Sequence, residues 1–254
     1  ILRFKLSYCS IRNMLSEVFC NLHLITKFNW NYHMNIQLHY FSGRGIGEPI
    51  RLTLVASDIP FTDHRYSTTD SSWRNKLEKH LPFGQMPALE VDGTFIGQAD
   101  SCARLAAKLA KLYPDDPVKA ALTDMVVVHQ SEIQKAIARL SFDGVPGAEG
   151  TKMVPEKERS ILINNWMNSS LPALLIRLEN LCGSPFIVGE TLTWADINVF
   201  CRLSQLLEIN PSVLNEGYPK LRSLEKHVRG LPAIAAWIDA HPEDYLATDS
   251  DVGS

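Results

Sequence analysis

Two short stretches carry the residue types best suited to chemistry. In the first, Tyr40 stands near the end of the segment 36–41, whose apolar and polar side chains alternate for most of its length and so predict a strand. The turn residues 42–45, Ser-Gly-Arg-Gly, follow. Glu48-Pro49 then opens a helix, because proline fits the first helical position and an acid favours the positive end of the helix dipole. Tyr40 therefore offers a phenolic hydroxyl, a hydrogen-bond donor, where a strand, a glycine-rich turn and a helix start meet.

The second stretch is Gly-Gln-Met-Pro-Ala-Leu at residues 84–89, which places Pro87 immediately before a strand. A proline there cannot donate a hydrogen bond to the sheet, so we expect a cis Met86–Pro87 bond and a backbone left free for a ligand. The segments 88–91 and 94–96 flank Asp92-Gly93, and this pair predicts a hairpin because it accepts positive φ angles.

A small sheet has to hold these two stretches. Asp58-Ile59-Pro60 ends the first helix, and residues 62–66 predict a second strand, parallel to the first, in a right-handed βαβ unit. A short polar helix or loop over 73–79, the hairpin and a helix over 100–112 follow. The sequence therefore predicts an α/β module with a four-stranded mixed sheet.

Beyond a linker at 113–117, we expect only helices. Apolar residues recur at helical spacing over 117–142 and again from 155, and Thr193-Trp194-Ala195-Asp196 is a capping box that begins a further helix. Asp196 is expected to have a structural role there. Two more helices are centred near Leu224 and Trp237.

These elements divide the chain into four expected regions. Residues 34–113 form the α/β domain, 117–247 the all-α domain and 248–254 a frayed tail. Residues 1–33 are expected to be an extension outside the fold, either unstructured or a translated non-coding stretch. They hold four basic residues and one acid, Glu17, and an organelle transit peptide is the alternative interpretation, although small residues and serines are few.

The composition excludes several function classes. The 254 residues include 25 Lys+Arg and 28 Asp+Glu, and the net charge of −3 gives no electrostatic argument for binding nucleic acid or acidic membranes. No run of about 18 uncharged apolar residues is present, so no membrane span is predicted. Five cysteines without C-x-x-C spacing predict no zinc or dithiol site and fit a reducing compartment.

The motifs together resemble those of the cytosolic glutathione transferases. The tyrosine-type branch (sigma-, alpha-, mu- and pi-like) matches best, the sigma-like members above all, and the resemblance extends over residues 34–245. The residues that carry it are His39–Gly45 with Glu48–Arg51, Leu81–Pro87, Leu89–Gly93, Gln98, Leu192–Asp196 and Tyr218–Leu221.

This resemblance implies a thioredoxin-like N-terminal domain, an all-α C-terminal domain that lines an electrophile pocket, and a cytoplasmic homodimer with a detoxification role. It implies an enzyme with glutathione as co-substrate, with no metal, that conjugates the glutathione thiol to a hydrophobic electrophile. Tyr40 is then the catalytic residue, whose hydroxyl stabilises the thiolate. The expected glutathione-binding residues are Tyr40, Trp73, Lys76, Gln85, Met86, Pro87, Gln98, Ala99 and Asp124 of the partner subunit.

Within that set, Met86 is expected to pair through its backbone with the cysteinyl unit of glutathione, as a strand would. Gln98 and Ala99 would receive the γ-glutamyl end. Trp73 would contact the glycyl end. The sequence leaves Lys76 and Lys79 open as partners of the glycyl carboxylate, and Gln85 is the better candidate because the motif fixes its place beside Met86.

Two positions depart from the family pattern. Ala99 stands where the family has Ser or Thr, so one hydroxyl donor to the γ-glutamyl carboxylate is missing. Ile46 stands where sigma- and alpha-like members have a second arginine, two residues after Arg44. We expect weaker glutathione binding from the first change. From the second we expect weaker thiolate stabilisation and a more apolar electrophile pocket.

These departures leave two alternatives to conjugation. One is a sigma-like, glutathione-dependent isomerase of lipid endoperoxides, of the prostaglandin D synthase type, which would share Tyr40 and differ only in the second pocket. The other is a non-catalytic relative, a ligand carrier or a crystallin-like protein.

Overall fold

The computed structural model describes residues 34–68, 72–143 and 152–245, and the chain divides into two compact units, 1–34 and 35–254. All elements below belong to the second unit. The expectations for residues 1–33 and for the tail 248–254 lie outside the described residues.

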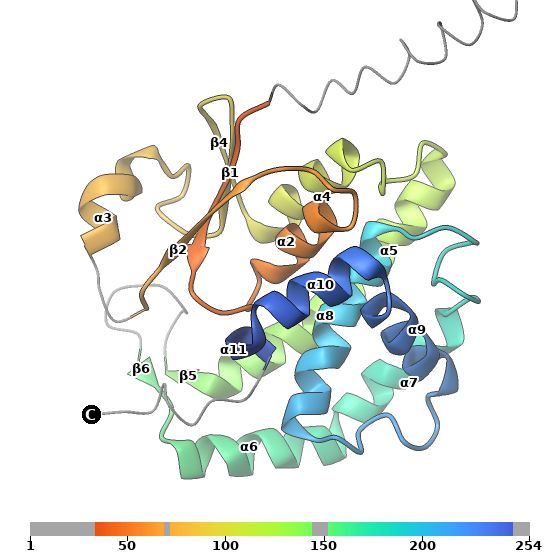
Figure 1. Ribbon diagram of the computed structural model, residues 1–254. Coiled ribbons are helices and arrows are strands. Elements are labelled where there is room, and N and C mark those ends of the chain that lie inside the picture. The colour runs from red at the N-terminus through yellow and green to blue at the C-terminus, as the bar shows by residue number, and fades with distance from the viewer. Residues whose placement is uncertain (1–33, 69–71, 144–151, 246–254) are drawn as a thin grey trace, which may run out of the picture. The chain divides into compact units, whose positions relative to one another are not determined.

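The N-terminal part of this unit is a four-stranded mixed sheet, as predicted (Figure 1). The strand order is β2-β1-β3-β4, with β1 and β2 parallel and the other neighbours antiparallel. The predicted hairpin turns at Asp92-Gly93, where both residues have positive φ angles. The strands are β1 (Ile36–Phe41), β2 (Thr62–Tyr66), β3 (Ala88–Val91) and β4 (Thr94–Gly97).

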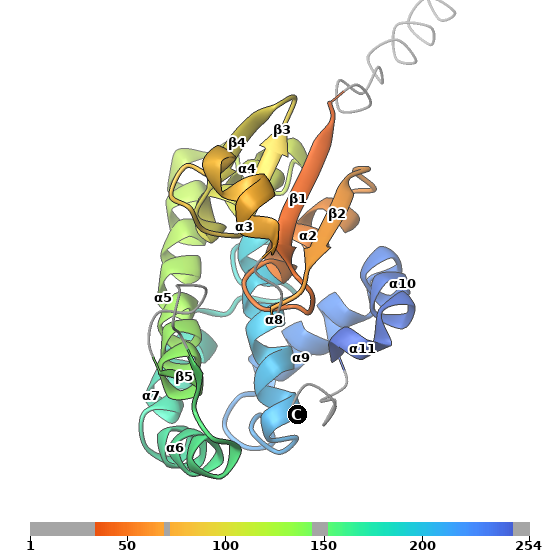
Figure 2. The same ribbon diagram turned by 90° about the vertical axis from the view of Figure 1, so that its left-hand side faces the viewer.

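Helices cover both faces of the sheet because side chains along β1 alternate between them (Figure 2). Ile36 and Leu38 are buried on the side of α2 (Glu48–Val55) and α4 (Ala99–Leu109). On the other side, Trp73 from α3 (Ser72–Leu77) packs its ring edge-on against Phe41, with the ring centroids 5.9 Å apart. A short 3₁₀ turn, η2 (Glu78–His80), follows α3.

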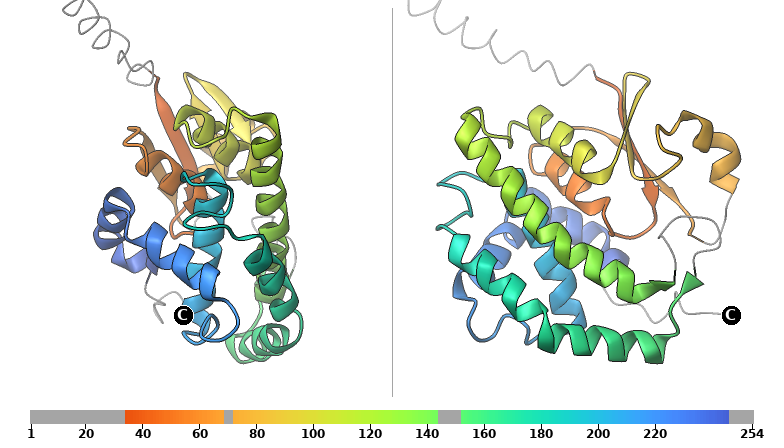
Figure 3. Two further views of the ribbon diagram at one scale, coloured as in Figure 1. Left: turned by 90° about the vertical axis from the view of Figure 1, so that its right-hand side faces the viewer. Right: turned by 180° about the vertical axis from the view of Figure 1, so that it is seen from behind.

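The C-terminal part is helical, apart from one two-residue strand pair that the sequence did not predict. The long helix α5 packs along α8, and α8 packs on α2 (Figures 1 and 3). Within the described residues, no helix is long and apolar enough to cross a membrane. The elements are α5 (Pro117–Ser141), β5 (Phe142–Asp143), β6 (Lys152–Met153), α6 (Glu156–Ser169), α7 (Leu171–Leu181), α8 (Trp194–Ile209), α9 (Pro219–Arg229), α10 (Pro232–Ala240) and α11 (Pro242–Tyr245).

The predicted capping box begins α8. The Asp196 carboxylate accepts hydrogen bonds from the backbone N–H and the hydroxyl of Thr193, both at 2.7 Å, and from the N–H of Ile187 at 2.8 Å. Trp194, fully buried, donates its Nε1–H to the Thr123 hydroxyl on α5 at 3.0 Å. These bonds fix where α8 starts and how it packs on α5, which confirms a structural role for Asp196.

A buried acid on α2 holds the last two helices in place. Glu48 is 1% exposed, and its Oε2 accepts a hydrogen bond from Arg51 at 3.1 Å. Its Oε1 accepts from the Trp237 indole on α10 at 3.2 Å and from the Tyr245 hydroxyl on α11. Burial first, and then the Glu48 carboxylate, raise the pKa of Tyr245, so its hydroxyl remains a donor. The charge on Glu48 is therefore satisfied from three elements at once.

Replacing Glu48 by glutamine tests this anchor. The carboxamide brings an N–H₂ group that has to face either Arg51 or the donors of α10 and α11, so a donor meets a donor. We expect Glu48→Gln to lower the free energy of unfolding by about 3–5 kcal/mol, as for other broken buried ion pairs. Denaturant unfolding followed by circular dichroism measures it.

Glu158, exposed on α6, provides the matched control. Glu158→Gln should change the free energy of unfolding by less than about 0.5 kcal/mol. Equal stability of both variants and the parent protein would show that Glu48 does not anchor the C-terminal helices.

Candidate active site

Three of the predicted site segments meet at one end of the sheet. His39 on β1 lies opposite Ala88 on β3, and Ala88 lies opposite Gly97 on β4. One position beyond this row, at the same end of the three strands, the chain has Tyr40, Pro87 and Gln98. The sheet register thus brings together side chains that are up to 58 positions apart in sequence (40 to 98).

Glycines let the loop after β1 lie directly on the Tyr40 ring. A Cβ atom on Gly47 would collide with ring carbon Cδ1, and one on Gly45 would lie 2.5 Å from the phenolic oxygen. Gly45 also has a φ of +46°, in the region that side chains other than glycine rarely adopt. The loop therefore packs backbone, rather than side chains, against the tyrosine.

The Tyr40 hydroxyl is an acceptor for this loop and keeps its own proton. Its oxygen accepts the N–H of Ile46 at 3.2 Å. Burial raises the pKa of Tyr40, and the Ile46 N–H, Arg51 and Arg202 offset that rise only in part. Within the part of the chain that the structure describes, no acceptor for the phenolic proton is present. Tyr40 can therefore donate that proton to a ligand atom.

The Met86–Pro87 peptide bond is cis, as the sequence predicted. Pro87 is buried, Met86 is half-buried and Gln85 is exposed beside them. Neither the N–H nor the C=O of Met86 bonds to another described residue. An extended ligand can therefore pair with this backbone.

The start of α4 is open to solvent. Gln98 is the N-cap, with a φ of +68° and an exposed side chain, and no side chain caps the helix. The backbone strain stored in a positive φ of a non-glycine residue is typical of functional sites. Ala99 and Asp100 then begin the helix, and the backbone N–H groups of this first turn have no acceptor within the helix.

The residues predicted for the glycyl end differ in their surroundings. Trp73 is 5% exposed and lies in a hydrophobic cluster with Leu77 and Leu81, rather than on the surface. Lys76 and Lys79 are exposed, and neither forms an ion pair with a described residue.

Asp124 lies on α5, and its carboxylate has two partners in the same protomer. Its Oδ1 accepts a hydrogen bond from Arg104 at 3.2 Å, and its Oδ2 accepts the Tyr113 hydroxyl at 3.1 Å. A contact of Asp124 with glutathione in a second subunit stays a prediction.

A pocket next to Tyr40 contains polar groups that sequence reasoning missed. Arg202, from α8, brings a buried guanidinium close enough to act electrostatically on Tyr40. Ile46 and Arg202 line the same pocket, so a cation is present there from another element, while the expected effect of Ile46 on the electrophile pocket stays a prediction. The pocket is lined by Ile46, Pro49, Ala99, Asp100, Ala103, Gln130, Ser131, Gln134, Asn198 and Arg202.

A signal for these residues was present in the sequence. Asn198 and Arg202 are four apart in an otherwise apolar stretch of α8, and Gln130 and Gln134 are four apart on α5. Residues four apart share one face of a helix, so each pair marks a polar stripe on a buried helix.

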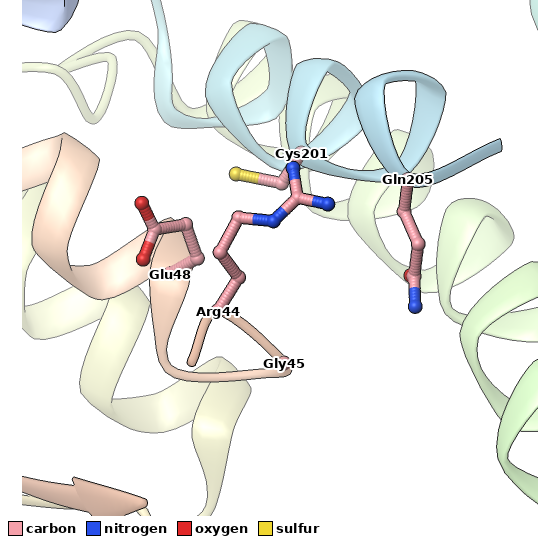
Figure 4. Close-up of a pocket in the computed structure, with 5 residues that line it drawn as sticks. All are labelled: Arg44, Gly45, Glu48, Cys201 and Gln205. Carbon is pink, nitrogen blue, oxygen red and sulfur yellow. The ribbon is translucent and has the colours of Figure 1, made fainter. Parts of the chain in front are cut away.

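A second pocket lies between the loop after β1 and α8, lined by Arg44, Gly45, Glu48, Cys201 and Gln205 (Figure 4). Arg44 reaches across to α8, where it donates to the Ser204 hydroxyl at 3.1 Å and contacts Glu208. Its guanidinium also lies 4.4 Å from the centre of the Tyr245 ring. Arg44 is thus engaged in packing the two parts of the unit together.

The thiols of the described cysteines are not nucleophiles. Burial raises the pKa of Cys201 to about 12, of Cys182 to about 12 and of Cys102 to about 11. All three are buried and free. Burial therefore disfavours the thiolate form of these three cysteines. The described residues also contain no group of three or more metal-ligating side chains.

Both parts of the chain match models of known protein families. Residues 36–100 match the family described as "Glutathione S-transferase, N-terminal domain", and residues 150–241 match "Glutathione S-transferase, C-terminal domain". The two matched ranges together cover more than half of the chain.

Individual proteins agree with this result. The chain is 33% identical over 210 residues to a hematopoietic prostaglandin D synthase of Gallus gallus, covering 82% of this chain and 98% of that protein. It is 31% identical over 208 residues to glutathione S-transferase 1 of Ascaris suum, covering 82% and 97%. A solved structure described as rat hPGDS complexed with a quinoline superposes with a TM-score of 0.68 at 30% identity, covering 81% and 96%. The chain therefore belongs to the glutathione S-transferase family of enzymes.

Proposed function

We propose that this chain is a tyrosine-type glutathione transferase in which Tyr40 stabilises the glutathione thiolate for attack on a hydrophobic electrophile. The observation that carries the proposal is the state of the Tyr40 hydroxyl. It is protonated, it accepts the Ile46 N–H at 3.2 Å, and it has a proton for which the described residues offer no acceptor. A sulfur atom placed beyond that oxygen would receive the proton as a hydrogen bond.

The chemical need for this bond follows from the thiol pKa. A free cysteine thiol has a pKa of about 8.5, so only about 3% is thiolate at pH 7. Lowering that pKa by about 2 units takes about 2.7 kcal/mol, which is within reach of a hydrogen bond to a charged sulfur. The thiol proton leaves to water, the sulfur forms a bond to carbon, and the leaving group departs with its electron pair.

The open backbone groups suggest how glutathione is seated. The cysteinyl unit pairs with the free N–H and C=O of Met86, beside Pro87. The γ-glutamyl carboxylate lies over the start of α4, at Gln98 and Ala99, where N–H groups and the helix dipole favour an anion.

Gln85 and Lys76 are exposed polar groups proposed for the glycyl end, with Lys79 the alternative cation, and Trp73 lies in the hydrophobic cluster that includes Leu77 and Met86. Asp124 of the partner subunit is proposed for the γ-glutamyl ammonium, which requires a homodimer. We also propose a cytoplasmic, detoxifying role, in line with the absence of paired cysteines among the described residues.

Isomerisation of a lipid endoperoxide is the second candidate. It is supported by relatives from four species whose names are hematopoietic prostaglandin D synthase, at 30–33% identity. An isomerase would regenerate glutathione, whereas a transferase consumes it. Measuring free thiol during turnover of an endoperoxide separates the two. Retention on glutathione resin together with activity toward 1-chloro-2,4-dinitrobenzene tests the first candidate against a protein without catalytic activity.

Removing the phenolic hydroxyl tests the role of Tyr40. Tyr40→Phe should lower kcat/KM for 1-chloro-2,4-dinitrobenzene about 10- to 100-fold, or about 1.4–2.7 kcal/mol, with glutathione binding nearly intact. The thiolate absorbance of bound glutathione should titrate at higher pH, because the thiolate loses its donor. Tyr218→Phe, at the N-cap of α9, removes a hydroxyl away from the site and should change neither quantity. An unchanged rate and titration in the Tyr40 variant would exclude it as the sulfur ligand.

The alanine at the start of α4 makes a separate prediction. Ala99→Ser restores a hydroxyl donor beside the γ-glutamyl carboxylate, so the dissociation constant of glutathione should fall about 5- to 30-fold, or about 1–2 kcal/mol. Calorimetric titration at low and moderate salt measures it, and the gain should persist at moderate salt. Ser101→Ala is the control and should bind like the parent protein. A loss of affinity in that control, with no gain in the serine variant, would show that Ser101 already supplies the bond.

A further inference from the structure

Unpartnered polar atoms gather in the pocket beside Tyr40. Among the described residues, five buried side-chain nitrogen or oxygen atoms have no hydrogen-bond partner. Three of them belong to residues that line this one pocket: Nε of Arg202, Oε1 of Gln130 and Oε1 of Gln134. Buried polar atoms are rarely left unpaired by protein, so their concentration at one place marks a site suited to a polar group from outside the chain.

Arg202 is the strongest of these groups. Its side chain is 3% exposed, and within the described part of the chain it has no carboxylate within 4.0 Å. Its Nη1 contacts only the neutral carboxamide of Gln205. The neighbouring cation, Arg44, by contrast has Glu208 as its partner. A buried guanidinium without a counter-charge is costly, and an anion from outside the chain would remove that cost.

The two glutamines suit the same kind of ligand. Oxygen and nitrogen of a carboxamide are assigned from their surroundings, so each glutamine can turn either atom toward the pocket. Ser131, between them on the wall of the pocket, already donates its hydroxyl to Val128 at 2.7 Å. The one acid on the wall, Asp100, is exposed at the start of α4. Among the described lining residues, the buried ionisable group is therefore the Arg202 cation, the glutamines offer adjustable amides, and the one acid, Asp100, is exposed.

The position of the pocket connects this anion site to the reaction. Ile46 lines the pocket, and its N–H is the group bound to the Tyr40 oxygen. Any ligand that reaches Arg202 therefore lies within the space next to the atom that would activate the sulfur. This neighbourhood favours a ligand that takes part in the reaction, and we assign it to one end of the electrophile.

We propose that this pocket selects electrophiles that carry a carboxylate, and that Arg202 is the specificity-determining residue that pairs with it. The inference rests on the proposed function and names its substrate class. With an aryl chloride, the reaction is a substitution at the ring carbon that bears the chlorine. The sulfur–carbon bond forms, chloride leaves with the bonding electron pair and the thiol proton goes to water. The carboxylate keeps its charge throughout and serves only to bind and orient the ring.

A matched substrate pair tests this inference directly. 4-Chloro-3,5-dinitrobenzoate and 4-chloro-3,5-dinitrobenzamide differ in charge but share the reacting carbon and leaving group. With each rate divided by its uncatalysed rate, the protein should prefer the benzoate in kcat/KM. Arg202→Met should lower that preference about 10- to 100-fold, the range for a lost hydrogen bond to a charged group. Arg202→Lys, which keeps the charge, should lose less of it.

Arg222→Met on α9 is the matched control, because Arg222 bonds only to Leu214 and Asn215 among the described residues and should not change the preference. No preference in the parent protein, or an equal preference in folded Arg202→Met, would overturn the inference. If that variant does not fold, the parent protein decides with two unreactive analogues. 3,5-Dinitrobenzoate should bind at least about tenfold more tightly than 3,5-dinitrobenzamide, and equal affinities would overturn the inference.

The binding comparison also separates this inference from the proposed function. Turnover of neutral 1-chloro-2,4-dinitrobenzene without any benzoate preference would support the proposed transferase activity and exclude the proposed role of Arg202. Tight benzoate binding that is lost in Arg202→Met and partly kept in Arg202→Lys, in a protein that conjugates neither aryl chloride, would support the anion site and exclude the proposed transferase activity.

Discussion

Arg51 is the residue on which the geometry of the site depends. Its fully buried guanidinium donates to the carbonyl of Phe41 at 3.2 Å and to that of Gly43 at 2.8 Å, and so fixes the path of the chain from β1 into α2. That path sets Ile46 against the Tyr40 oxygen. A guanidinium is always charged and has five N–H donors in one plane, so a single side chain can satisfy two carbonyls and two carboxylates. A lysine has neither the number of donors nor their geometry.

The carboxylates around Arg51 extend this constraint to the end of the described chain. Glu48 accepts from α10 and α11, while Asp63 on β2 is shared between Arg51 and Arg65, which in turn pairs with α11. Each of these charges has given up water, so its stability depends on the others remaining in place. The last helices are therefore part of what positions the catalytic loop, although they contribute no atom to the proposed thiolate contact. They connect chemistry at residue 40 to packing some 200 positions later.

Much of the fold could be predicted from the sequence because its signals are local. Asp92-Gly93 fixes a hairpin by the φ angles that two residues accept, Pro87 marks the strand edge, and Thr193 with Asp196 starts a helix through bonds three residues apart. The position of Tyr40 between a strand and a helix could be predicted for the same reason, since its strand, turn and helix follow one another in the sequence. The missed elements lack such signals. β5 and β6 are two residues each, and α11 is a single turn whose Tyr245 gains its main bond from Glu48, 197 positions away.

The polar side of the pocket could not be predicted, because it depends on how α5 and α8 pack. From the sequence, Ile46 suggested a loss of positive charge near the sulfur. Only the fold shows that Arg202, on α8, lines the same pocket as Ile46. The two positions are not equivalent electrostatically. A cation on the loop at 46 would stand at a half-buried position where water screens it. A cation on α8 is desolvated, so its attraction for an anion is stronger and the penalty for a neutral or misplaced group is larger. In the proposed role of Arg202, a cation on the helix therefore contributes more to discrimination among electrophiles than a cation on the loop would.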